Sequence, residues 1–115
     1  MKLIVAIVQP QRLDAVKEAL ARREIFRMTV VEAQGFGAQQ GKAEFFRGQA
    51  LTANLVPKVE IQIAVNDDFV EPALEAIVEG GRTGPAGKVG DGKIFVLPID
   101  DCIRIRTGER GPEAI

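Results

Sequence analysis

The feature of this sequence that most constrains its fold is a strand–helix–strand pattern of apolar residues that occurs twice. In the first half, the apolar run 2–8 is rich in β-branched residues, and apolar residues then recur at helical spacing at Leu13, Val16 and Leu20. Residues 28–33 form a second extended run before a Gly-Phe-Gly sequence. The first half therefore predicts a strand, a helix and a strand.

The second half repeats this order. Residues 58–65 alternate between apolar and polar side chains, which is typical of a strand with one buried face. The helical stripe that follows consists of Val70, Ala73, Leu74 and Ile77. A strand over 93–97 completes the pattern, and 102–106 predicts a short fifth strand. The two halves together predict an α+β ferredoxin-like βαββαβ sandwich in one domain, 1–115.

The start of the second helix carries a further signal. Asp68 and Glu71 have the spacing of a capping box, in which each side chain binds a free backbone N–H group. Pro72 is compatible with this helix only because it lies in the first turn, where its missing N–H group has no helical partner.

The first strand predicts an assembly. Two helices cover only one face of such a sheet, whereas the run 2–8 is apolar on both faces. Because the chain has no further segment to cover the second face, we expect a second subunit there and a closed homo-oligomer.

Composition argues against several classes of function. The formal net charge of −1 provides no field to attract nucleic acid or an anionic membrane. The sequence contains no His, Tyr, Trp or Ser, so the usual general base and the serine nucleophile are missing, and we expect a protein that is not an enzyme. The single Cys102 fits a reducing compartment, and the apolar amino-terminal run is too short to span a membrane. We therefore expect a cytoplasmic protein without membrane insertion.

Two segments outside the predicted elements are candidates for function. Residues 37–57 form a long connection without a sustained hydrophobic period, which is unusual in so small a domain unless it is functional. Aromatic and apolar residues lie in it together with an arginine, a combination typical of protein interfaces. These candidate partner-binding residues are Phe45, Phe46, Arg47 and Leu51, with Leu55 beside them.

The second segment is the connection 80–93, which is crowded with glycines from Gly80 and Gly81 onward and ends at Lys93. Residues 87–93 match the first seven positions of the phosphate-loop pattern G-x-x-x-x-G-K, but Ile94 occupies the position that should be Ser or Thr. A strand also follows here, where the true motif enters a helix, so a P-loop hydrolase is disfavoured. Consecutive glycines can still turn backbone N–H groups toward an anion, and Lys88 and Lys93 add positive charge.

Two arginines strengthen the prediction of a phosphate site. Arg104 and Arg106 are two residues apart on the predicted fifth strand, so their side chains would leave the same face. Guanidinium groups suit phosphate oxygens well. We interpret Lys93, Arg104 and Arg106 as three cations beside the glycine-rich loop.

These segments together resemble the PII nitrogen-regulatory signalling proteins over nearly the whole chain. The glycine-rich stretch and the Ile-Arg-Ile-Arg-Thr-Gly-Glu stretch are together highly specific for this family. The matching stretches are 35–37, 46–48, 57–59, 90–96, 103–109 and 113–115.

The resemblance implies a homotrimer of ferredoxin-like subunits that binds ATP or ADP competitively in the clefts between subunits. It divides the functional segments into a T-loop at about 37–57, a B-loop at about 81–92 and a carboxy-terminal segment at about 102–115. By matched position, the nucleotide-binding residues would be Thr29 near the base and Gly37, Gly90, Gly92, Lys93, Arg104 and Arg106 on the phosphates.

The resemblance also implies further ligands and partners. Gln39 would help to hold a magnesium ion that chelates 2-oxoglutarate together with ATP, and Lys58 would pair with a carboxylate of that acid. The T-loop would change shape with the bound ligands and dock onto an ammonium transporter or an enzyme of nitrogen assimilation.

The sequence departs from the family pattern in three places. Leu51 and Gln49 stand where other members carry a Tyr and a Ser that can be modified, and Ala38 replaces a common Arg. Residues 83–90 carry about three extra residues around Pro85-Ala86-Gly87. These departures leave open a divergent PII paralogue that senses only ATP and ADP and controls a different transporter or enzyme.

Overall fold

A computed structural model of the chain describes residues 1–36 and 55–115 and confirms the predicted order of elements. The strands and helices alternate as β1, α1, β2, β3, α2 and β4. Their bounds are β1 Lys2–Val8, α1 Leu13–Ala21, β2 Thr29–Gly35, β3 Val56–Val65, α2 Val70–Gly81 and β4 Gly92–Pro98.

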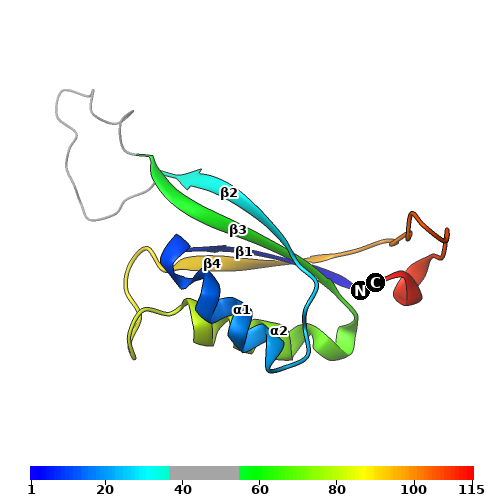
Figure 1. The fold of residues 1–115 in the computed structure, drawn as a ribbon, viewed down its shortest axis with the longest axis horizontal. Coiled ribbons are helices and arrows are strands. Elements are labelled where there is room, and N and C mark those ends of the chain that lie inside the picture. The colour runs from blue at the N-terminus through cyan, green and yellow to red at the C-terminus, as the bar shows by residue number, and fades with distance from the viewer. Residues whose placement is uncertain (37–54) are drawn as a thin grey trace.

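The four strands form one antiparallel sheet in the order β2-β3-β1-β4. Both helices lie on the same side of this sheet and run alongside each other (Figure 1). This arrangement is the ferredoxin-like α+β fold that the two strand–helix–strand halves predict. Within the described residues, no helix is long and apolar enough to cross a membrane.

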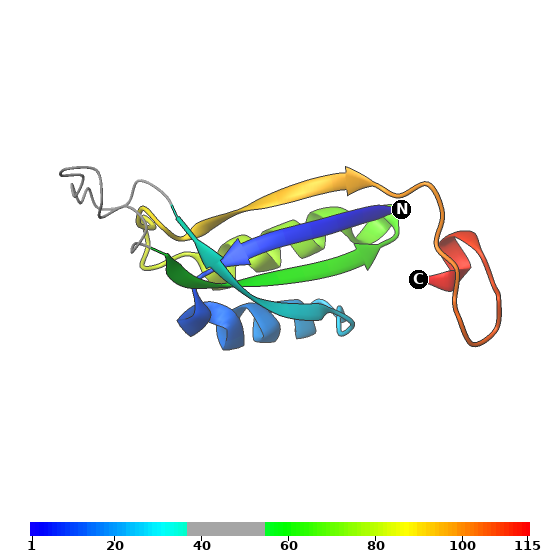
Figure 2. The same cartoon turned by 90° about the horizontal axis from the view of Figure 1, so that it is seen from above.

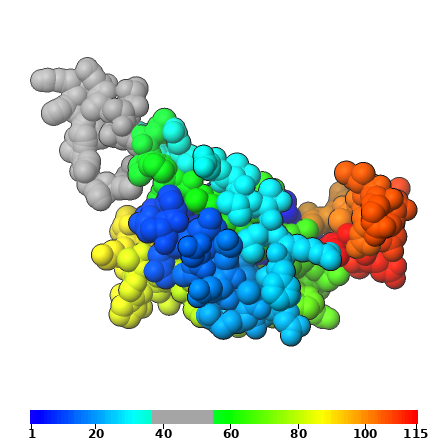
Figure 3. Space-filling model, viewed as in Figure 1, coloured from blue at the N-terminus to red at the C-terminus, as the bar shows by residue number. Residues whose placement is uncertain are grey.

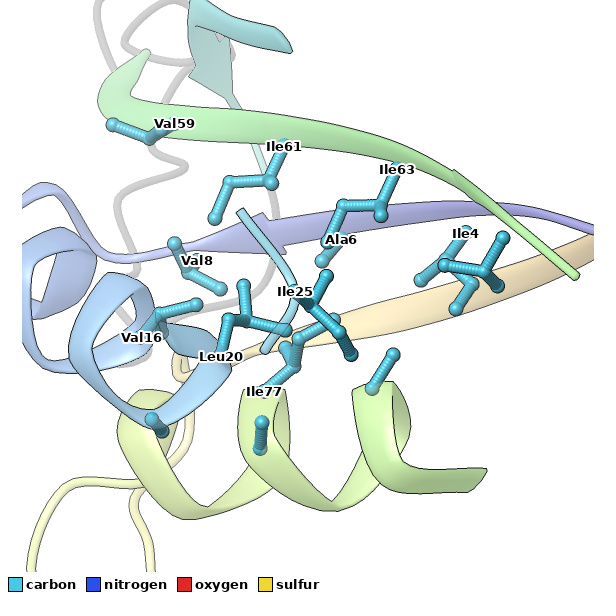
Figure 4. Packing of buried hydrophobic residues seen from close by; sticks show 14 residues of the cluster. Ile4, Ala6, Val8, Val16, Leu20, Ile25, Val59, Ile61, Ile63 and Ile77 are labelled. Atoms are coloured by element: carbon cyan, nitrogen blue, oxygen red, sulfur yellow. The ribbon is translucent and has the colours of Figure 1, made fainter. Parts of the chain in front are cut away.

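The core lies between the sheet and the helices (Figure 4). Alternate residues of β1 and β3 point toward the helices because successive side chains of a strand leave opposite faces. The buried strand residues are Ile4, Ala6, Val8, Val59, Ile61, Ile63 and Val65. The helices meet them with Val16, Ala19, Leu20, Ala73, Ala76 and Ile77, which confirms the helical stripes expected from the sequence.

A glycine sets the close approach of the two helices. A Cβ atom placed on Gly80 would lie 2.6 Å from the Cα atom of Val16, so no side chain fits between the backbones there. The sequence pattern suggested that Gly80 and Gly81 belong to the glycine-rich connection, and this is wrong, because α2 continues through Gly81. The connection itself therefore begins at Arg82.

The predicted capping box at the start of α2 is also wrong. A short 3-10 helix, Asp67–Phe69, precedes α2, and the N-cap position is Phe69, which makes no side-chain capping bond. The amino-terminal ammonium group instead donates to the carboxylate of Asp67 at 2.9 Å. This hydrogen bond and the positive charge lower the pKa of Asp67. Pro72 does lie in the first turn of α2, as expected.

The carboxy-terminal segment does not form the short strand expected over 102–106. Only an isolated bridge joins Ile103 to Arg110, and the residues between them turn back on themselves. Gly108 has a φ of +77°, a conformation that favours glycine and reverses the chain here. A 3-10 helix, Gly111–Ala114, ends the chain.

The face of the sheet opposite the helices has no cover within the described part of the chain. The strand register places apolar residues of β1 and β4 side by side on this open face, including Val5 opposite Phe95 and Leu3 opposite Leu97. Phe95 is 48% exposed and Leu97 is 42% exposed. The second face of β1 therefore lacks the cover that its apolar sequence predicts.

Candidate functional site

The glycine-rich connection and the flanks of the long loop lie at one end of the sheet. At this end β1 finishes with Val8, which is paired with Gly92 at the start of β4. The pair Gly35 and Val56 closes β2 and β3 at the same end (Figure 1). The antiparallel topology thus brings together two segments that are far apart in the sequence.

The carboxylate of Asp91 organises the connection 82–91. Its Oδ2 atom accepts hydrogen bonds from the backbone N–H groups of Thr83 at 3.0 Å and Lys88 at 2.9 Å. Its Oδ1 atom accepts the hydroxyl of Thr83 at 2.6 Å. The hydroxyl of Thr83, its N–H group and the N–H group of Lys88 lower the pKa of Asp91 to about 2.

The carbonyl oxygen of Gly90 ties the loop to the sheet. It accepts a hydrogen bond from the Gln9 side-chain amide at 2.8 Å and another from the Lys58 ammonium group at 2.9 Å. The prediction from sequence included Lys58 but missed Gln9. The position of Gln9 could have pointed to this role, because it is the first polar residue after the apolar first strand.

Glycine is required at two positions of this loop. Gly92 has a φ of +111°, and a Cβ atom there would lie 1.7 Å from the carbonyl oxygen of Ile7. Gly90 has a φ of +100°. These conformations turn the backbone between Lys88 and β4, as expected from the glycine spacing.

The loop offers donors to an anion. Within the described residues, the N–H groups of Val89 and Gly90 donate to no protein acceptor, and the exposed ammonium group of Lys93 makes no ion pair. Backbone N–H groups beside an ammonium group fit the oxygens of a phosphate. Lys93 lies in β4 and not at the start of a helix, which agrees with the absence of a true P-loop.

The two arginines lie at the opposite end of the subunit. β4 finishes at Pro98 opposite Lys2, and the next residue, Ile99, donates to the carbonyl of Met1 at 3.2 Å. The path from Lys93 to Pro98 alone spans about 17 Å at the usual rise of a strand. Figures 2 and 3 show the glycine-rich connection and the carboxy-terminal segment at opposite ends. Within one subunit, Arg104 and Arg106 therefore do not lie beside Lys93 and the glycine-rich loop.

The arginines differ in their surroundings. Arg104 donates to the carboxylate of Glu109 and, at 3.1 Å, to the carbonyl of Glu113. A guanidinium group has five N–H donors, so Arg104 keeps donors for a further ligand. Arg106 is exposed in the turn and makes no ion pair within the described residues.

Three predicted site residues share the open face of the sheet. Lys93 is paired with Ile7, and both lie on the face opposite the buried Val8. Lys58 lies on this same open face, because the next residue of β3, Val59, is buried against the helices. Thr29 is opposite Gln62 on the same face. Thr29 nevertheless lies four positions along the sheet from the level of Lys58, so the two side chains do not form one cluster.

A cavity of about 280 Å³ borders the loop on the other side of the sheet. Val8, Ile77 and Ile94 give it a largely apolar lining between α2 and β4. Two of the predicted ligand-binding residues, Gly92 and Lys93, also line it, whereas Thr29, Lys58 and the two arginines do not.

Several predicted residues lie outside the described residues: Gly37, Gln39, Phe45, Phe46, Arg47 and Leu51. Their predicted roles remain predictions. Leu55, which flanks them, is exposed. In the segments 1–36 and 55–115, no three His, Cys, Asp or Glu side chains gather in a group that could hold a metal ion.

Comparisons with known proteins agree with this architecture. A family model described as nitrogen regulatory protein P-II matches residues 1–109. The chain is 53% identical to nitrogen regulatory protein GlnK1 of Methanosarcina mazei, covering 100% of this chain and 97% of that protein. It is 49% identical to nitrogen regulatory protein P-II of Azospirillum brasilense over the full length of both. The solved structure of Arabidopsis thaliana PII bound to citrate has a TM-score of 0.80 and 41% identity, covering 99% of this chain and 91% of that one.

Proposed function

The chain belongs to the P-II family of nitrogen regulatory proteins, and we propose that it binds ATP or ADP in the clefts between the subunits of a homotrimer. In this proposal the protein is a signalling protein without a catalytic step. The bound nucleotide sets the state of the segment 37–57, which regulates a transporter or an enzyme of nitrogen metabolism.

One observation carries the proposal: the glycine-rich loop and the two arginines lie at opposite ends of one subunit (Figure 2). Three cations separated in this way can bind one triphosphate only if two subunits contribute them. The open face of the sheet, with the exposed Phe95 and Leu97, provides an apolar surface on which other subunits can pack.

This geometry indicates which residues each subunit would contribute to the cleft. Gly90, Gly92 and Lys93 of one subunit would present N–H groups and an ammonium group to the phosphates. Arg104 and Arg106 of its neighbour would approach the same phosphates from the other side. Thr29 would lie near the base, and Gly37 would complete the phosphate contacts.

A second ligand fits the same end of the sheet. Lys58 presents its ammonium group beside the loop, where it would pair with a carboxylate of 2-oxoglutarate. Gln39 would contribute to a magnesium ion that joins this acid to ATP. That the Arabidopsis thaliana relative was solved with citrate, also a carboxylate, supports the binding of an organic acid by this chain.

The partner-binding surface would be the segment that contains Phe45, Phe46, Arg47 and Leu51. An ammonium transporter or an enzyme of nitrogen assimilation fits the regulatory names of the relatives. Leu51 has no hydroxyl group, so regulation would rest on ligand binding and not on nucleotidylation at that position.

Calorimetry tests the proposal directly. The protein is titrated with ATP, with ADP, and with 2-oxoglutarate in the presence of magnesium and ATP, while light scattering reports its mass. We expect a trimer, competitive binding of the two nucleotides and binding of 2-oxoglutarate only with magnesium and ATP. Nucleotide binding without any response to the acid would favour a paralogue that senses ATP and ADP alone. A stable monomer, or no binding of either nucleotide, would overturn the proposal.

A further inference from the structure

The connection between α2 and β4 is divided into two parts by a single carboxylate. Thr83 and Lys88 both donate their backbone N–H groups to the same Oδ2 atom of Asp91. The segment 84–87 therefore begins and ends beside the same carboxylate oxygen of Asp91. Residues 88–92 continue from that point to β4.

The first part is an excursion with few constraints. Gly84 and Gly87 have φ values of +71° and +76°, which turn the chain out and back. A Cβ atom on Gly84 would contact nothing within 4 Å, and Pro85 and Ala86 are exposed. Pro85, Ala86 and Gly87, around which the family resemblance predicts about three extra residues, lie in this part.

The second part is fixed to the sheet. The carbonyl of Gly90 is held by Gln9 and Lys58, and Gly92 packs against the backbone of Ile7. Asp91 lies between these two glycines, and its own N–H group donates to the carbonyl of Lys88 at 3.1 Å. Asp91 thus belongs to the fixed part and holds the ends of the other part.

We propose that Asp91 is a positioning residue that holds residues 88–93 in the phosphate-binding conformation and isolates them from the excursion 84–87. The proposal rests on the proposed nucleotide site. In this proposal the extra residues around 85–87 have no effect on nucleotide affinity, because Thr83 and Lys88, which flank the segment 84–87, are both bound to Asp91.

The role of Asp91 is geometric and not electrostatic. A negative carboxylate beside a phosphate site is repulsive, so its charge cannot improve phosphate binding. An asparagine can reproduce the three contacts: its carbonyl oxygen accepts the two N–H groups, and its amide donates to the Thr83 hydroxyl. Alanine can make none of them.

The experiment compares the full-length protein with three variants: Asp91→Ala, Asp91→Asn, and a deletion of residues 85–87. Calorimetry gives the ATP and ADP dissociation constants. Amide hydrogen exchange at Thr83 and Lys88 reports the contacts to Asp91 without any nucleotide. A thermal melt of each variant shows that the fold persists.

We expect Asp91→Ala to weaken ATP binding about tenfold, as it would if the loop kept its binding conformation for only a tenth of the time. Asp91→Asn and the deletion should bind ATP within about threefold of the parent. Both amides should exchange slowly in the parent and in Asp91→Asn, and rapidly in Asp91→Ala. If Asp91→Ala does not fold, Thr83→Val, which removes one of the three donors, should replace it and weaken binding about threefold.

The outcomes separate the two proposals. A parent that binds neither nucleotide overturns the proposed function, and the exchange rates alone then decide the role of Asp91. Equal exchange in all variants, or a deletion that weakens binding as much as Asp91→Ala, overturns the positioning role. Weak binding by Asp91→Asn would also overturn it, since the charge would then be essential.

Discussion

The ammonium group of Lys58 donates a hydrogen bond of 2.9 Å to the carbonyl oxygen of Gly90. This contact joins the central strand β3 to the glycine-rich loop, and the side-chain amide of Gln9 donates to the same oxygen at 2.8 Å. A carboxylate that draws Lys58 away leaves Gly90 held by Gln9 alone. The proposed acid site and the proposed phosphate site are thereby linked through one carbonyl group.

The first prediction concerns this lysine. Lys58→Met keeps an unbranched side chain beside Gly35 but removes the charge. We expect 2-oxoglutarate binding in the presence of magnesium and ATP to weaken about ten- to a hundredfold, because a hydrogen bond to a charged group contributes about 1.5–3 kcal/mol. Gln9→Leu is the control, since it removes the other donor to Gly90 without changing the charge. Calorimetry measures both, and an unchanged acid affinity in Lys58→Met would show that Lys58 is not a ligand.

The second prediction uses the separation of the cations within one subunit. Lys93→Ala and Arg106→Ala should each weaken ATP binding about ten- to a hundredfold. When the two variants are co-expressed and mix at random in a trimer, about a quarter of the clefts receive a wild-type loop and a wild-type arginine. Tight ATP sites should reappear in that proportion. If the mixture binds no better than its two components, each site lies within one chain.

The third prediction concerns the open face of the sheet. Phe95→Asp places a charge on this face next to Val5, where desolvation by a packed subunit would be costly. We expect light scattering to show dissociation of the assembly. Val78→Asp is the matched control, because Val78 is an exposed apolar residue on α2. Dissociation in both variants, or in neither, would place the subunit contact elsewhere.

The fourth prediction separates two glycines of the same connection. Gly92→Ala brings a Cβ atom against the carbonyl of Ile7 at a φ of +111°, so we expect a loss of about 3 kcal/mol or more in the free energy of unfolding. Gly84→Ala meets no neighbouring atom, and its positive φ alone should cost about 1–2 kcal/mol. Urea denaturation measures both. Equal losses would mean that the loop relaxes around the added methyl group at Gly92.

The fifth prediction follows from the pKa of Asp91, which is lowered to about 2. A carboxyl group with a lowered pKa in the folded state stabilises the protein above its unfolded pKa of 3.8, and this contribution is lost as the pH falls through 2. The parent should therefore lose stability between about pH 4 and pH 2 more steeply than Asp91→Asn does. Thermal melts across this range give the difference between the two proteins. Parallel curves would show that Asp91 makes no such contribution.

The sequence by itself predicted the elements and their order. The period of apolar residues in 58–65 and in the stripe from Val70 to Ile77 reflects local geometry, because side chains alternate on a strand and recur every three to four residues on a helix. It also predicted that the glycine-rich loop belongs to a binding region, and the family resemblance added Lys58 to that prediction. Local patterns were less reliable at the ends of elements. There Gly80 continued a helix, Asp68 formed no cap, and 102–106 formed a turn.

The tertiary structure decided which of the predicted site residues lie close together. The sequence predicted Lys93 and Arg104 beside one loop, but within a subunit the extended strand between them carries them to opposite ends of the sheet. Conversely, the antiparallel pairing brought Gln9, Lys58 and Gly90 to one point from three separate parts of the chain. Hydrophobic periodicity is a property of neighbouring residues, whereas these contacts depend on strand register and on the path of a loop. Only the folded chain therefore determines which donors share a site and which must come from another subunit.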